Sequence, residues 1–563
     1  MLSKRGLGYD PTDRANTKRL RANVSDLLLS NEVSATRARS VFEDAHLAGA
    51  AHVADLARTG NHGRCKGNIA RDVLAKLLKQ NQWPKPYYAK IRVFDRKTQA
   101  TITAWLPILL PHELLHCLSE HANREVLHGI EELEGGSLEH FLKAKQQLGG
   151  GDFVPVALWG DGVPCNYDRT ESLEAFTLSL PGLKGPNRLL RIPLACLTKK
   201  FVIKEETFDD ILQVIAWSFR VSSVGLFPAN RHDGACFLKS DLWRSKRALR
   251  PLGSSGILTE IRGDWVFYKS CFRLPAWNEN AGCCWRCDAT PQDIRDCTLD
   301  AAWRTSRLSH WDFIARLILQ GKTMSPILRA PCVEISCFKI DWLHTMDIGV
   351  AADVLGNILL MLLPKMGGAS ASENCKRIFI RMRAWYKNNP VDSKYDNLIP
   401  TMIQKKASTP PKLRGKAAEV RSLVPFVKLL AEEFFSDADI MESTAKEAAK
   451  LLNGMYECLS AAAVFSGDHL AERSRKLCLL WVAMEAQSVP PRWRVKPKMH
   501  LVQELCEMSI GDRPALSWTY RDEEFGGSLA QYVRKRGGHH TPIAVGRAVL
   551  LKFIAKHPIP RIV

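Results

Sequence analysis

Hydrophobic positions recur at helical spacing through the first part of the chain. Apolar residues lie three or four positions apart over 41–56 and again over 68–78, which predicts two helices. Pro111 suits the first position of a further helix. The three glycines at 149–151 interrupt this pattern and indicate a domain boundary. The sequence therefore predicts a mostly helical N-terminal region over residues 1–150.

After these glycines the pattern changes to short apolar runs. The run 153–159 predicts a buried strand that ends in a Gly-Asp-Gly turn at 160–162. Two more strands, a helix and a strand ending in an acidic residue are predicted, in this order, over 173–180, 189–197, 205–219 and 256–264. Three strands followed by a helix and another strand favour a mixed α/β sheet.

The helical pattern returns after residue 300. It is clearest over 348–363, 373–387, 416–435 and 445–464. The most apolar run contains Asp353 and ends in proline, which predicts a buried helix, because a membrane span needs about 20 apolar residues. The sequence predicts four parts: the helical region 1–150, the first part of an α/β core over 151–290, a helical insertion over 291–498, and core helices with a basic tail over 499–563.

Composition adds a strong positive charge to this picture. The chain has 563 residues, and its 79 Lys and Arg against 59 Asp and Glu give a net charge of +20. Hydrophobic residues make up 46% of the sequence, which excludes a disordered chain. This charge favours nucleic acid as a partner, although solvated lysines alone can give the same balance. The basic residues that we expect to contact phosphates are Lys405, Lys406, Lys412, Arg414, Lys416, Arg534, Lys535 and Arg536.

Acidic residues follow two of the predicted strands. Asp161 and Asp264 each come after an apolar run and a glycine. Carboxylates at strand ends can hold hard divalent cations, and a third carboxylate from a helix would complete a two-metal site for phosphoryl transfer. Glu523 or its neighbour Glu524 is the candidate for this third group. The alternative is structural, since Gly-Asp is common in turns and acids are favoured at helix N-termini.

Cys284-Trp-Arg-Cys287 has the spacing of a zinc clamp. Two thiolates separated by two residues can bind one Zn²⁺ ion, which needs two further ligands. His500 is the best distant candidate, and Cys283 and Cys506 are weaker ones. The alternative is that both cysteines are buried thiols without a metal.

Two motifs with histidine have simple structural interpretations. Asp341 lies three residues before His344 and suits the cap of a helix that begins near Trp342. His112-Glu-Leu-Leu-His116 matches the pattern of zinc peptidases, in which two histidines share a helix face. Pro111 directly precedes this motif, however, whereas the peptidase motif lies well inside a helix, where proline would break the hydrogen bonding. We therefore expect the residues 112–116 to be structural.

Taken in order, these residues resemble the DDE transposases with an RNase H-like core, and especially the CACTA-type group and the V(D)J recombinase. That family has an Asp on the first strand, another after the fourth, a Cys-x-x-Cys, a helical insertion, a histidine zinc half-site and a Glu on a helix. The matching residues here are Asp161, Asp264, Cys284 with Cys287, His500 and Glu523. Asp341-x-x-His344 resembles the D(2)H string of several such superfamilies, and the stretch 341–349 looks like transposase-like families of dinoflagellate genomes.

The resemblance implies an α/β RNase H-like mixed sheet core with a large all-α insertion. It implies DNA cleavage and strand transfer with two Mg²⁺ or Mn²⁺ ions about 4 Å apart, held by Asp161, Asp264 and Glu523. Glu524 and Asp341 are the alternative catalytic carboxylates. The further implications are a structural Zn²⁺, transposon-end and target DNA as partners, a homodimer, a nuclear location and no membrane.

The chain departs from the family at one zinc position. The family has a second histidine four or five residues after the first, where this chain has Glu504 and Leu505. The zinc site is therefore expected to use an unusual ligand or to be lost. Copies in such families are often decayed, so the main alternative is a non-catalytic DNA-binding protein derived from a transposase. A zinc metallopeptidase that uses residues 112–116 is a third, more distant alternative.

Overall fold

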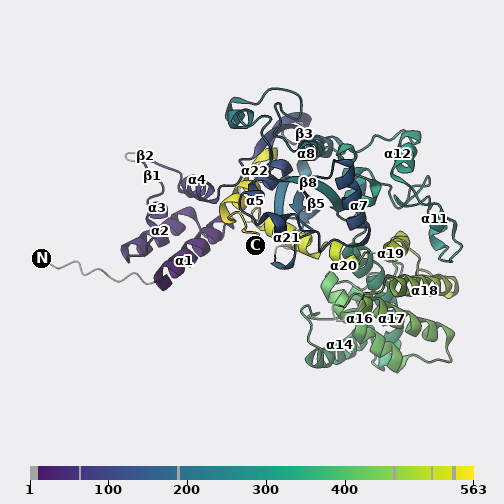
Figure 1. Cartoon of the computed structure of the whole chain (residues 1–563). Coiled ribbons are helices and arrows are strands. Elements are labelled where there is room, and N and C mark those ends of the chain that lie inside the picture. Colours follow the sequence, from purple (N-terminus) through teal and green to yellow (C-terminus); the bar gives the residue numbers. More distant parts are fainter. Residues whose placement is uncertain (1–10, 63–64, 187–189, 461–464, 509–511, 535–540) are drawn as a thin grey trace.

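The computed structural model describes residues 11–62, 65–186, 190–460, 465–508, 512–534 and 541–563. It shows a mixed α/β protein, as the sequence predicts. A four-stranded sheet lies at the centre, with N-terminal helices on one side of it and a bundle of later helices on the other (Figure 1).

The central sheet contains the four strands predicted between residues 153 and 264. They are β5 (Phe153–Pro164), β6 (Ser172–Ser179), β7 (Arg191–Thr198) and β8 (Ser255–Arg262). Their spatial order is β7-β6-β5-β8, in which β5, β6 and β7 pair antiparallel and β8 runs parallel to β5. The strands are buried on both faces of the sheet, which explains why they appear in the sequence as continuous apolar runs.

The predicted turn at 160–162 is wrong. β5 continues through these residues to Pro164, and Asp161 pairs with Ala175 of β6. Gly160 serves close packing here, because a Cβ atom at this position would lie 2.3 Å from the Phe267 ring on α10 (Trp265–Phe272). A glycine in a strand can therefore indicate the close approach of a helix instead of a turn.

Helices cover both faces of the sheet (Figure 1). α5 (Pro111–Ser119), α8 (Glu206–Val224) and α10 pack on one face, where Cβ atoms at Gly160 and Gly256 would meet their side chains. On the other face, α7 (Gly135–Gln147) packs against β8 and α21 (Tyr520–Gln531) packs against β5. Gly526 of α21 lies directly against the Trp159 ring.

The N-terminal region contains helices, as expected, and also a β-hairpin. Residues 41–56 contribute to two separate helices, α2 (Ala35–Leu47) and α3 (Ala54–Ala57), while α4 (Ile69–Asn81) agrees with the helix predicted over 68–78. An antiparallel hairpin of β3 (Tyr87–Asp95) and β4 (Ala100–Ile108) follows, which the sequence interpretation missed. Its first strand buries every second residue, the period of a half-buried strand.

The helical insertion has its predicted helices. They are α13 (Ala352–Leu362), α14 (Ala371–Asn388), α16 (Ala417–Phe434) and α17 (Ile440–Cys458), with residues 461–464 of the last prediction lying outside the described part. α18 (Gly467–Gln487) and α19 (Pro497–Met508) lead back toward the core. Within the described residues, Leu343–Met366 is the one helical stretch that is long and apolar enough to cross a membrane, and 83% of its most apolar window is buried inside the protein. This burial agrees with the predicted core helix.

Candidate functional site

Two adjacent parallel strands bring Asp161 and Asp264 to the same edge of the sheet. Trp159 of β5 pairs with Arg262 of β8, so the acid that follows each of them by two residues lies at a similar level. Asp264 caps α10, and its Oδ1 accepts a hydrogen bond of 2.5 Å from Phe267 N. Asp161 lies on the sheet face that α21 covers, and α21 carries Glu523 in its first turn.

The three predicted carboxylates form one electrostatic group. Burial and the charge of Asp161 raise the pKa of Glu523 to about 9, and they also raise the pKa of Asp264. Glu523 Oε1 is buried, and a hydrogen bond between the Glu523 and Asp161 carboxyl groups adds to the shift. The group therefore places carboxyl groups close together in a partly buried environment, and their oxygen donors fit a hard divalent ion.

Glu523 is the acid that completes the group, and Glu524 is not. The Glu524 side chain is 69% exposed and pairs with Arg521 at 3.2 Å. The preceding acid, Asp522, is fully buried and accepts a hydrogen bond of 2.7 Å from Arg191 Nε. The three consecutive acids therefore have three different environments, of which only that of Glu523 faces Asp161.

Asp341 and His344 lie against the same group. They open a π-helix, Leu343–Ala351, where Asp341 acts as the predicted cap. Asp341 Oδ1 accepts hydrogen bonds from Leu343 N and Thr519 N, and Oδ2 accepts them from His344 N at 2.9 Å and His344 Nδ1 at 2.6 Å. Because both oxygens are engaged, we assign Asp341 to positioning and not to the third carboxylate.

The neighbouring acids act on the titration of the His344 ring. Burial alone would lower the pKa of His344, but the hydrogen bond and charge of Asp341, together with the charge of Glu523, raise it to about 9. One ligand atom from each of Asp161, His344 and Glu523 lies within 4.8 Å of the others. The predicted D(2)H string therefore belongs to the acidic site in space.

Two functional neighbours escaped the sequence interpretation. Glu174 of β6 is buried on the opposite sheet face, and burial raises its pKa with the charges of Asp161 and Asp264 adding to the shift. Its signal was a single acid inside an otherwise apolar strand.

Asp347 of the π-helix is fully buried and accepts hydrogen bonds from Tyr456, Tyr520 and Trp342. Burial raises its pKa to about 7. Because Tyr520 begins α21, Asp347 helps to fix the helix that carries Glu523.

A second cluster has the donors of a zinc site. Cys284, Cys287, His500 and Glu504 are all buried, and one ligand atom from each lies within 4.8 Å of the others. Cys287 Sγ lies 3.4 Å from His500 Nε2, which lies 3.5 Å from Glu504 Oε1. Two sulfurs, one imidazole nitrogen and one carboxylate oxygen suit four-coordinate Zn²⁺.

Contacts around this cluster orient its donors. Arg286 N donates to Cys284 Sγ at 3.3 Å, and Arg307 pairs with Glu504 Oε2, which leaves Oε1 directed at the cluster. Glu504 follows His500 by one helical turn of α19, at the position where the resemblance led us to expect a second histidine. Cys283 and Cys506 are buried but do not belong to the cluster. The sequence had marked Glu504 only as a departure from the family.

The residues 112–116 form part of the packed interior. α5 begins at Pro111, as predicted. His112 Nδ1 lies 2.8 Å from Ser218 Oγ, and His116 Nδ1 accepts a hydrogen bond of 2.9 Å from Gly253 N. Both oxygens of Glu113 bind Arg244, at 2.7 and 2.8 Å. Among the described residues, none of these three side chains is in a group able to hold a metal.

The predicted phosphate-binding residues have different environments. Lys405, Lys406, Arg414 and Lys416 are exposed on the insertion. Lys412 is half-buried near Asp353, and burial lowers its pKa. Arg534 donates a hydrogen bond of 3.0 Å to the Pro164 carbonyl, and Lys535 and Arg536 lie outside the described residues.

A large cleft separates the insertion from the core next to α21. Its volume is about 1760 Å³. Its basic lining residues are Arg191, Arg262, Lys416, Arg421, Lys428, Arg513 and Arg521, against the acids Asp392, Glu457 and Glu524. The aromatic side chains of Trp518 and Tyr520 also line it. Basic side chains therefore outnumber acidic ones in the lining, although ion pairs join Arg191 to Asp522 and Arg521 to Glu524. The cleft borders the helix that carries Glu523.

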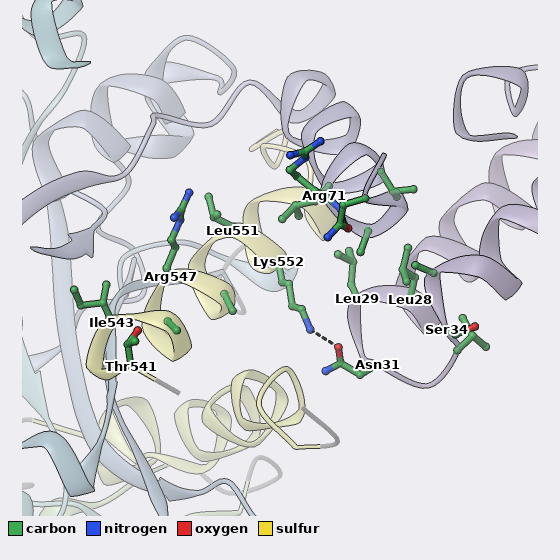
Figure 2. Close-up of a pocket in the computed structure, with 18 of the residues that line it drawn as sticks. Leu28, Leu29, Asn31, Ser34, Arg71, Thr541, Ile543, Arg547, Leu551 and Lys552 are labelled. Carbon is green, nitrogen blue, oxygen red and sulfur yellow. Dashed lines mark hydrogen bonds between the residues drawn. The ribbon is translucent and has the colours of Figure 1, made fainter. Parts of the chain in front are cut away.

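A second cavity, of about 1050 Å³, lies far from the acidic group. Figure 2 shows that it lies between the N-terminal helices and α22 (Pro542–Lys556). Leu28, Leu29 and Leu551 give it apolar walls, and Lys552 Nζ bonds Asn31 Oδ1 across it at 2.8 Å. Within the described part of the chain, the candidate residues named from the sequence do not line this cavity, so the acidic site, the cleft and the zinc cluster carry the functional argument.

In comparisons with known proteins, no protein-family model matches the chain and no curated protein is significantly similar to it.

Proposed function

We propose that the protein is a transposase-like enzyme that cleaves DNA and transfers strands through Asp161, Asp264 and Glu523. The convergence of these three carboxylates carries the proposal. They come from two strands and a distant helix, yet Asp161 raises the pKa of both other acids. Burial and the charge of Asp161 oppose ionisation of these acids, whereas a bound cation would favour their ionised forms. Paired divalent cations at carboxylates serve phosphoryl transfer.

The sheet supports the RNase H-like part of the proposal. Three antiparallel strands are followed by a parallel fourth strand next to the first. Phe338 forms a parallel bridge with Ile261 of β8, and Lys339 N donates to the Ile261 carbonyl at 2.9 Å. This short pairing takes the place of a fifth strand directly before Asp341. The helical insertion then separates this edge from α21.

Each acid has a separate task in the proposed reaction. Asp161 and Glu523 would hold the cation from β5 and α21. Asp264, whose Oδ1 caps α10, would be the third carboxylate beside them. Bound Mg²⁺ or Mn²⁺ supplies activation of the attacking hydroxyl and stabilisation of the leaving oxygen. Asp341 and Asp347 keep α21 in place through Thr519 and Tyr520.

The basic cleft supports DNA as the substrate. It lies beside α21, and Lys416, Arg421 and Arg521 extend its positive charge from the insertion to the core. Trp518 stacks against Arg421 at 4.7 Å from the ring centre, which places an aromatic and a cationic surface together. Phosphate groups bind to such surfaces largely by charge, which gives affinity without a sequence preference.

Cleavage of plasmid and oligonucleotide DNA tests the proposal. We expect the wild-type protein to cut DNA only with Mg²⁺ or Mn²⁺. Removing a residue that only supports a metal ligand typically lowers activity roughly 10–100-fold. Because Asp161 would be a ligand itself, Asp161→Asn should lower the cleavage rate by more than this. Glu472→Gln on α18 is the matched control, because this exposed acid lies outside both the proposed site and the cleft. Cleavage by Asp161→Asn at the wild-type rate would refute the site. DNA binding without any cleavage would identify the non-catalytic alternative.

A further inference from the structure

The imidazole of His344 is directed at the two acids that face each other across β5 and α21. Its Nε2 lies 3.9 Å from Glu523 Oε1, and Asp161 offers an oxygen within 4.8 Å of both. Donors bound to one small divalent ion at about 2.1 Å lie roughly 3–4 Å from one another. Small side-chain rotations therefore suffice to bring all three atoms onto one ion.

The other side of the ring is held as in a metal-binding histidine. His344 Nδ1 lies 2.6 Å from Asp341 Oδ2, and the Asp341 carboxylate is itself fixed by Leu343 N and Thr519 N. The His344 carbonyl accepts a hydrogen bond of 2.7 Å from Lys498 Nζ. A carboxylate on one ring nitrogen fixes the tautomer and orientation that direct the other nitrogen toward a metal.

A purely structural role explains the contact with Glu523 poorly. A distance of 3.9 Å is too long for a hydrogen bond. Glu523 Oε1 is buried, and the hydrogen-bonding neighbour of this carboxyl group is Asp161, a second acid. The ring and the carboxylate thus face each other across a gap, and an ion between them would satisfy both.

We propose that His344 is a nitrogen ligand of the divalent cation at Asp161 and Glu523, with Asp341 as its positioning residue. This assignment rests on the proposed function and adds a preference among metals. Mg²⁺ is bound almost entirely by oxygen, whereas imidazole ligands favour transition-metal ions. The site therefore binds Mn²⁺ in preference to Mg²⁺.

Pulsed electron paramagnetic resonance of Mn²⁺ bound to the full-length, zinc-loaded protein tests this ligand directly. We expect modulation from a coordinated ¹⁴N nucleus, replaced by the ¹⁵N pattern when the protein is labelled with ¹⁵N-histidine. His344→Gln should lose the nitrogen signal and bind Mn²⁺ about 10–100-fold more weakly, with Asp341→Asn between it and the wild type. His469→Gln, an exposed histidine on α18, is the control and should change neither.

The outcomes separate this proposal from the proposed function. Mn²⁺ that depends on Asp161 and Glu523 but shows no nitrogen coupling would overturn the role of His344 and leave the carboxylate site intact. Metal binding that is unaffected by Asp161→Asn would instead remove the site itself. Should His344→Gln fail to fold by circular dichroism, the labelled wild-type protein still decides, since among the described residues His344 is the histidine in this group.

Discussion

At the scale of single residues, the acidic site concentrates charge that the fold alone does not fully neutralise. Glu523 lies beside Asp161, and burial weakens the solvation of the Glu523 carboxylate. Neighbouring acids that are equally negative but exposed, such as Glu524, have no such conflict. Functional sites are where proteins tolerate such unfavourable arrangements, and the conflict can be measured as a dependence of stability on pH.

We expect the metal-free protein to become less stable as the pH rises from about 5 to 9. The pKa of Glu523 is raised in the folded state from 4.5 to about 9, so its contribution is fully present below pH 4.5 and is lost as the pH rises through 9. His344, with its raised pKa, adds to the loss in the same direction. The decrease in unfolding free energy should reach a few kcal/mol, at about 1.4 kcal/mol per pKa unit.

Asp161→Asn should flatten this curve, because it removes the neighbouring charge that raises the pKa of Glu523. Urea unfolding at several pH values in magnesium-free buffer measures the effect, and Glu524→Gln should retain the wild-type slope. Equal slopes for the wild type and Asp161→Asn would show that the two carboxylates do not interact.

At the scale of elements, the zinc cluster joins segments that lie far apart in the chain. The Cys284–Cys287 loop follows β8 and α10, whereas His500 and Glu504 belong to α19 at the end of the insertion. A bound metal would therefore fix the beginning of the insertion to its end. Arg307 adds an ion pair to Glu504 from a third segment.

We expect purified wild-type protein to contain one zinc ion per chain. Cys284→Ser should lose the metal and lower the melting temperature by several degrees, because a structural zinc contributes directly to the free energy of folding. Glu504→Gln should weaken zinc binding while the two thiols and the imidazole still hold the ion. Cys236→Ser, at an exposed free cysteine, is the control and should keep both metal and stability. Wild-type protein without zinc in atomic absorption would contradict this assignment.

The sequence predicted elements well where one period dominates. The strands of the central sheet and helices such as α8 and α16 appear as plain apolar runs or helical spacing. The β3–β4 hairpin was missed although Tyr87, Ala89, Ile91 and Val93 alternate, because helical neighbours biased the interpretation. The turn assigned to Gly160 failed because packing against Phe267 cannot be seen in a local pattern.

In the candidate site, too, the sequence could identify residues that belong to a motif, but not contacts between distant segments. The resemblance supplied Asp161, Asp264 and Glu523, of which the structure places Asp161 and Glu523 in one group of possible metal ligands. Asp264 lies near enough for the charge of Asp161 to raise its pKa, but it is not in that group. Glu504 was visible only as a missing histidine, because its direction toward Cys284 depends on α19 packing beside a loop more than 200 residues earlier. The approach of His344 to Glu523 likewise required the tertiary fold.

At the scale of the whole molecule, the insertion and the core form the two walls of one positively charged cleft. Seven Lys and Arg side chains line this cleft, against three acids. Helix α16 lines the cleft, and the loop directly before it carries four exposed bases, Lys405, Lys406, Arg414 and Lys416. Of these four, Lys416 itself lines the cleft. Charge placed beside the acidic site would direct DNA to the carboxylates despite their own negative charge.

We expect this loop to contribute a measurable part of DNA affinity. Replacing its four exposed bases by Gln should weaken binding uniformly across DNA sequences, and the slope of log affinity against log salt should fall by about 0.9 for each phosphate that the variant no longer neutralises. The matched control replaces Lys97, Lys204, Lys239 and Lys246, four exposed lysines outside the insertion, so that both variants carry the same net charge. Fluorescence anisotropy with labelled duplexes at several salt concentrations measures both slopes. If the two variants lose affinity equally, net charge alone attracts DNA and the cleft has no special part in binding. A reduced slope only in the loop variant would place the duplex along the insertion, beside the helix that presents Glu523.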